Sequence, residues 1–75
     1  MSLLTQAIIA EKYGVRLTVD KLGEAMGVAP QTIYNQISKG VFPVKTYVEG
    51  GKRWCAYEHL AEYFEACRER ASLEA

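Results

Sequence analysis

A break of three residues between two helical patterns constrains this chain more than any other feature. Before the break, apolar residues recur at intervals of three and four positions, as on one face of a helix: Val19, Leu22 and Met26. Gly27 is a residue type that ends helices, and Pro30 suits the first position of the next one because its missing N–H would have no partner there. Residues 18–39 are therefore predicted to form two short helices joined by a tight turn.

The second of these helices, PQTIYNQIS, carries an unusual outer face. Ile33 and Ile37 are four positions apart and are expected to point into the core. The residues left outside are small and uncharged, whereas surface helices usually carry Lys and Glu. Asn and Gln can bond adenine with two contacts, and Thr can meet the thymine methyl group. We expect a helix-turn-helix whose second helix enters the major groove and reads bases through Gln31, Thr32, Asn35 and Gln36.

The N-terminal segment, residues 1–14, is predicted to form a further helix. The run LLTQAIIAEKY contains neither Gly nor Pro, and Gly14 follows it as a stop signal. Its apolar residues wrap further round the helix than one docking stripe requires. A domain of this size also gains from extra burial, which a second subunit could supply. We therefore expect a homodimer that associates through four apolar residues of this helix: Leu4, Ile8, Ile9 and Tyr13.

After Pro43 the pattern changes from helical to alternating. Two β-rich runs flank Gly50-Gly51, which can supply the positive φ angles of a tight turn, so residues 44–56 are predicted to form a β-hairpin. Pairing across this turn puts an aromatic pair on one face and two mixed pairs on the other: Tyr47 with Trp54, then Thr46 with Cys55 and Val48 with Arg53. Aromatic bulk favours burial of the first face, and aliphatic content favours burial of the second.

The last segment, residues 57–71, is predicted to form an amphipathic helix. Its apolar stripe consists of Tyr57, Leu60, Ala61, Phe64, Cys67 and Ala71. The opposite face carries most of the glutamates of the chain, which read most simply as a solvated surface.

The charges are unevenly distributed, although the formal net charge is zero. Residues 28–53 hold four cations against one anion, a net charge of +3, whereas residues 54–75 hold two cations against five anions, a net charge of −3. A neutral protein can thus present a basic face to phosphates. Six residues of the second helix and the hairpin are expected to contact the DNA backbone: Tyr34, Ser38, Lys39, Lys45, Lys52 and Arg53. Lys and Arg on a hairpin also protect an edge strand from pairing, and both uses can hold together.

Several classes of function lack support in the sequence. Eleven residues separate Cys55 from Cys67 and His59 is the single histidine, so no zinc set can be assembled. No nucleophile–base set is present, and no apolar run approaches the roughly 20 residues of a membrane span. We expect a single cytoplasmic domain over residues 1–75 with no secretory signal, no membrane partner, no metal and no cofactor. It is not expected to be an enzyme.

The order of these motifs resembles a known family. The matching residues are Leu22, Met26, Gly27-Val28, Thr32-Ile33-Tyr34, Gly40, Phe42-Pro43, Gly50-Gly51, Arg53, Leu60 and Tyr63. Over about residues 17–66 the chain resembles small winged helix-turn-helix proteins of the AlpA and phage excisionase type, which have a MerR-like core. The N-terminal helix, ending in AEKYG, is similar to that of the pyocin-activator family.

The resemblance implies a mainly α fold with a small β-hairpin wing and a function in sequence-specific DNA binding. A bacterial or phage-encoded regulator of transcription is implied, or an excisionase that bends double-stranded DNA for a recombinase or works with another regulator. Two departures stand out: Ala29 occupies the position of a helix-capping Ser, and the reading helix contains no Arg. The alternative is a protein-interaction adaptor or antirepressor that keeps this fold without strong DNA binding.

Overall fold

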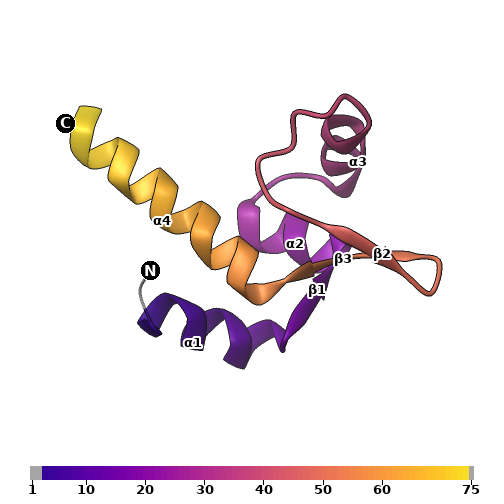
Figure 1. The fold of residues 1–75 in the computed structure, drawn as a ribbon, viewed down its shortest axis with the longest axis horizontal. Coiled ribbons are helices and arrows are strands. Elements are labelled where there is room, and N and C mark those ends of the chain that lie inside the picture. Colours follow the sequence, from indigo (N-terminus) through magenta and orange to yellow (C-terminus); the bar gives the residue numbers. More distant parts are fainter. Residues whose placement is uncertain (1–2, 75) are drawn as a thin grey trace.

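The computed structural model describes residues 3–74, which form four helices and a small antiparallel sheet (Figure 1). The elements follow in the order α1 (Leu3–Tyr13), β1 (Arg16–Thr18), α2 (Val19–Met26), α3 (Pro30–Ser38), β2 (Tyr47–Glu49), β3 (Lys52–Ala56) and α4 (Tyr57–Glu74). The expected mainly helical chain with a small hairpin is therefore confirmed. No helix of the described residues combines the length and apolar character that crossing a membrane requires.

The sheet contains a strand that the sequence analysis did not predict. Its order is β1-β3-β2, so β1 pairs with the outer side of the hairpin and β3 becomes the central strand. The strand β1 has three residues, too few to show an alternating pattern. Its last residue, Thr18, also begins α2, because its Oγ1 accepts a hydrogen bond from the Lys21 backbone N–H at 3.3 Å. Strand β1 and helix α2 are thus joined without a loop.

The hairpin has the expected turn and register. Gly50 and Gly51 have φ angles of 61° and 78°, and Tyr47 lies opposite Trp54. The paired strands are shorter than the predicted range 44–56, since β2 begins only at Tyr47. The buried face is the one that holds Cys55, whose side chain is 1% exposed. The face with the Tyr47–Trp54 pair lies outward, and on the opposite face Cys55 is buried whereas Val48 is 60% exposed.

The core draws one or two side chains from almost every element. Five of its members are almost completely buried: Leu17 from β1, Leu22 from α2, Ile33 from α3, Cys55 from β3 and Leu60 from α4. Across the sheet, Leu17 pairs with Cys55. Helix α4 follows its predicted stripe at its N-terminal end, where Leu60 and Ala61 are buried, but Ala71 is exposed. The end of α4 therefore contributes little to the core.

The connection between α2 and α3 leaves no room for a side chain at Gly23. The chain turns at Gly27, whose φ angle is 76°, and the Val28 backbone N–H donates to the Gly23 carbonyl oxygen at 3.0 Å. A Cβ atom built on Gly23 would lie 2.6 Å from the Val28 carbonyl oxygen. Helix α3 then begins at Pro30 and receives no side-chain cap from Ala29. Close approach at Gly23 thus sets how tightly α3 folds back on α2.

Gly23→Ala tests this constraint. In an ordinary helix interior the change would stabilise the fold by up to about 1 kcal/mol. Here we expect a destabilisation of roughly 1–3 kcal/mol, because the added methyl group pushes the backbone of Val28 away. Urea unfolding measures the free energy of unfolding, with Glu24→Ala as an exposed control on the same helix. A Gly23→Ala variant more stable than the parent would show that the turn relaxes freely.

Candidate nucleic-acid interface

Helix α3 presents a polar surface that its packing leaves open. Ile33 is its buried residue, whereas Gln31, Thr32 and Asn35 are exposed as the sequence predicted. Gln36 is half-buried and lines a groove of about 370 Å³ between the α2–α3 turn and α4, away from the exposed face. Three of the four candidate base-reading residues therefore share one open face, and Gln36 is turned away from it.

Two residues of this face are joined to each other. The Nε2 atom of Gln31 donates a hydrogen bond to Oδ1 of Asn35 at 3.1 Å, one helical turn further on. The bond holds both amide groups side by side on the exposed surface.

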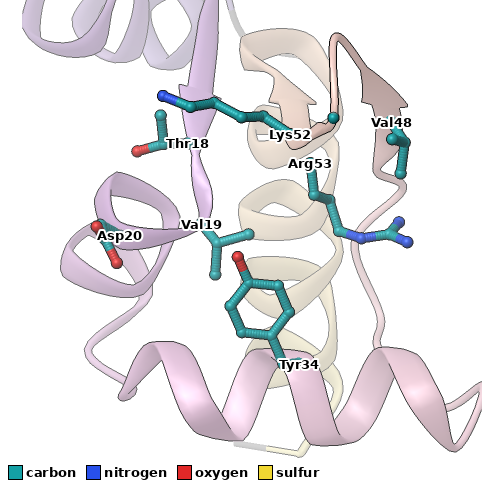
Figure 2. A pocket seen from close by; sticks show the side chains of 8 residues that line it. Thr18, Val19, Asp20, Tyr34, Val48, Lys52 and Arg53 are labelled. Atoms are coloured by element: carbon teal, nitrogen blue, oxygen red, sulfur yellow. The ribbon is translucent and has the colours of Figure 1, made fainter.

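A groove of about 380 Å³ separates α3 from the hairpin. Its lining comes from β1, the first turn of α2, the middle of α3 and the hairpin: Thr18, Val19, Asp20, Tyr34, Val48, Gly51, Lys52 and Arg53. Figure 2 shows Tyr34 rising from α3 with its hydroxyl pointing into this groove, while Lys52 extends over the opposite side toward Thr18. The groove therefore brings together three candidate phosphate-contacting residues that lie as many as nineteen positions apart: Tyr34, Lys52 and Arg53.

The groove has the electrostatic character of an anion site with one opposing charge. Lys52 and Arg53 supply positive charge and Tyr34 a hydroxyl donor, and Val19 and Asp20 from the first turn of α2 complete this side of the lining. The Arg53 guanidinium is held by one bond, from Nη1 to Thr46 Oγ1 at 2.8 Å, and keeps further donors available. Asp20 is the only acidic residue in the lining. Two cations against one anion leave the groove positive.

The remaining candidate phosphate contacts lie elsewhere on the surface. Ser38 and Lys39 are exposed at the C-terminal end of α3. Lys45 is exposed as well and lines a groove of about 280 Å³ with His59 and Arg70 of α4. The two ion pairs between described residues join Arg16 to Glu49 and Lys21 to Glu24, so neither involves a candidate cation.

An arginine that the sequence analysis did not single out fastens the hairpin. Arg16 Nη1 lies 3.2 Å from Glu49 Oε1, and the guanidinium carbon lies 3.8 Å from the centre of a Trp54 ring. A hydrogen bond with Tyr47, and to a smaller extent one with Glu49, raises the pKa of Arg16. The side chain thus reaches from β1 across β3 to β2. Only the presence of β1 explains this contact, since Arg16 and Glu49 are 33 positions apart.

The association residues predicted on α1 divide between two sides of the helix. Ile9 is 6% exposed and belongs to the core, and Tyr13 is half-buried against the core. Leu4 and Ile8 are 70% and 57% exposed. The expectation that Ile9 lies in a subunit interface is therefore wrong, because the chain's own core already covers it.

The two thiols differ in their surroundings. Burial raises the pKa of Cys55 to about 11, so this thiol remains protonated and acts as a small apolar group. A hydrogen bond from Tyr63, and to a smaller extent one from Arg70, lowers the pKa of Cys67. Among residues 3–74, no three His, Cys, Asp or Glu side chains gather in a way that could hold a metal ion.

Arg16→Lys tests whether the guanidinium fastens the hairpin. Lysine keeps the charge but lacks the flat group that stacks on an aromatic ring. Because Trp54 is the single tryptophan, its fluorescence reports this contact directly. We expect emission at longer wavelength and stronger quenching by acrylamide, while Arg68→Lys on α4 leaves both unchanged. Identical spectra for Arg16→Lys and the parent would show that the stacking does not persist in solution.

Comparison with known proteins assigns the chain to no family. No family model matches it, and no curated protein or solved structure is significantly similar to it. Function is therefore inferred from the residues and geometry described above.

Proposed function

We propose that this protein is a sequence-specific, double-stranded DNA-binding protein of the winged helix-turn-helix type. In this proposal α2 and α3 form the helix-turn-helix, and the β2–β3 hairpin is the wing. The observation that carries it is the groove that Tyr34, Lys52 and Arg53 line beside the polar face of α3. Base-reading groups and phosphate-binding groups then lie next to each other, as a helix in the major groove requires.

The proposed docking follows from the exposed residues. The N-terminal half of α3 enters the major groove, which is wide enough to admit a helix. Gln31 and Thr32 then face base edges from the first turn, and Asn35 faces them from one turn further on, since all three are exposed. The flanking phosphates approach the groove between α3 and the hairpin. Lys52 and Arg53 supply the positive charge there, and Asp20 limits how much they attract DNA non-specifically.

The resemblance of the motif order to AlpA-type and excisionase proteins supports a role in a bacterial or phage-encoded regulatory process. The protein acts as a transcriptional regulator or as an excisionase working with a recombinase. Both roles are performed in the cytoplasm by binding DNA, without catalysis or cofactor.

We also propose that two copies associate through the outer face of α1. Leu4 and Ile8 lie exposed one turn apart on this helix, and Leu3 before them is exposed too. Apolar side chains gathered on one helix face gain free energy when a second surface covers them. The same face supports the second candidate function, an adaptor or antirepressor that binds another protein rather than DNA.

Salt titration separates DNA binding from the adaptor function. We expect affinity for random duplex DNA to fall steeply with salt, because bound cations leave the phosphates. In a plot of log affinity against log salt concentration, Lys52→Ala and Arg53→Ala should each flatten the slope by roughly one unit. Arg68→Ala on α4 is the control, since this exposed arginine lies outside the proposed interface. Weak binding at every salt concentration would favour the adaptor, and unchanged slopes would assign the hairpin cations to edge protection.

Ile8→Glu tests the association of two copies. The side chain is mostly exposed in one copy, so the change should leave the fold intact and shift a dimer toward monomer in analytical ultracentrifugation. Val41→Glu introduces the same charge at another exposed apolar position, 64% accessible in the loop after α3, and should not change the sedimentation. A parent protein that is monomeric at high concentration would exclude the homodimer.

A further inference from the structure

The two amides joined on α3 present a restricted set of hydrogen-bonding groups. A side-chain amide has one carbonyl oxygen and one NH₂ group. The bond from Gln31 Nε2 to Asn35 Oδ1 uses one N–H and one oxygen. Gln31 keeps its oxygen, an acceptor, and a second N–H, and Asn35 keeps its NH₂ group, a donor. The Gln31 oxygen and the Asn35 NH₂ group therefore form an unused acceptor–donor pair. If the bond ran in the other direction, from Asn35 to Gln31, the remaining pair would again be one acceptor and one donor.

This pair of groups matches one base edge in the major groove. Adenine presents an acceptor at N7 and a donor at its N6 amino group, so Asn35 can donate to N7 while Gln31 accepts from N6. Guanine presents two acceptors, N7 and O6, and would set its O6 against the free amide oxygen. Cytosine offers only a donor, and thymine an acceptor beside a methyl group. Adenine alone satisfies both groups at once.

The rest of the exposed face of α3 does not favour guanine either. Residues 31–38 contain no Arg and no Lys, the side chains that most often contact guanine. The two amides also need no rearrangement before binding, because their mutual bond already holds them together. Preorganisation of this kind reduces the entropy lost on binding.

We infer that Gln31 and Asn35 form a single recognition unit that reads one adenine in the major groove. This inference rests on the proposed DNA binding and names its base preference. It differs from the simpler arrangement in which each amide bonds its own adenine with its own oxygen and NH₂ group. In the single unit both residues act on the same base, so removing either one destroys the contact.

A double-mutant cycle on a selected binding site distinguishes these arrangements. The parent protein is first used to select bound duplexes from a randomised pool. At the adenine on which binding depends, Gln31→Ala and Asn35→Ala should each reduce the preference for adenine roughly 5- to 150-fold, the range of one good base contact. The double variant should lose no more than either single variant. Arg68→Ala on α4, outside the proposed interface, should retain the preference.

Base analogues check the same contact from the DNA side. Replacing that adenine by 7-deazaadenine removes the N7 acceptor, and replacing it by purine removes the N6 amino group. Each analogue should weaken binding of the parent protein and leave the Gln31→Ala and Asn35→Ala variants unaffected.

The possible results are separable. If the fold-losses of adenine preference in the two single variants multiply in the double variant, the amides read different bases. If the selected site requires guanine at the contacted position, the recognition unit is overturned altogether. Binding to DNA with no enriched sequence would overturn the unit and the sequence specificity of the proposed function, and would leave non-specific DNA binding in place. Absence of salt-dependent binding would instead overturn the proposed function, and the recognition unit with it.

Discussion

The pairing of Leu17 with Cys55 joins β1, near the start of the chain, to the hairpin strand β3. It places β1 against β3 and buries both side chains in the core between the helices and the hairpin. A two-stranded hairpin is at best marginally stable alone, and a third strand gives it a fixed base. Because Thr18 ends β1 and caps α2, the same strand also fixes where α2 starts relative to the hairpin. Residues of β1, of the start of α2 and of the hairpin line the groove beside α3, so these connections place three of its walls.

Helix α3 is attached to the core through one side only. Ile33 is its one fully buried side chain, Ile37 is half-buried, and no side chain caps its first turn. Its polar residues therefore need no partner within the described chain, and most of its surface is available to another molecule. Its direction is still fixed by attachment through one side and by the tight turn at Gly27, which packs closely on Gly23. A recognition helix has the same two requirements, a fixed direction and an open face.

The parts of the fold that could be predicted are those specified by neighbouring residues. Gly27 and Pro30 mark the turn between helices, and Gly50-Gly51 marks the hairpin, since each acts through its own backbone. The strand β1 could not be predicted because three residues show no period, and the Arg16 contact depends on that strand. Ile8 and Ile9 are adjacent isoleucines on a helix that is apolar on most sides, so only their packing shows that Ile9 is the buried one. The spacing of Ile33 and Ile37 predicted the inward side of α3, and Gln31, Thr32 and Asn35 are exposed as expected, but the half-burial of Gln36 depends on packing against other elements.

The Arg16–Glu49 pair also bears on why a chain of zero net charge can present a basic surface. Glu49 is the only anion among residues 28–53, and its carboxylate lies 3.2 Å from Arg16, a cation from outside that segment. The cations of residues 28–53, which are Lys39, Lys45, Lys52 and Arg53, are therefore not paired with the acid nearest to them in sequence. Most remaining anions belong to α4, whose C-terminal end points away from the hairpin (Figure 1). Charge separation across the fold, rather than net charge, determines which side can approach a phosphate backbone.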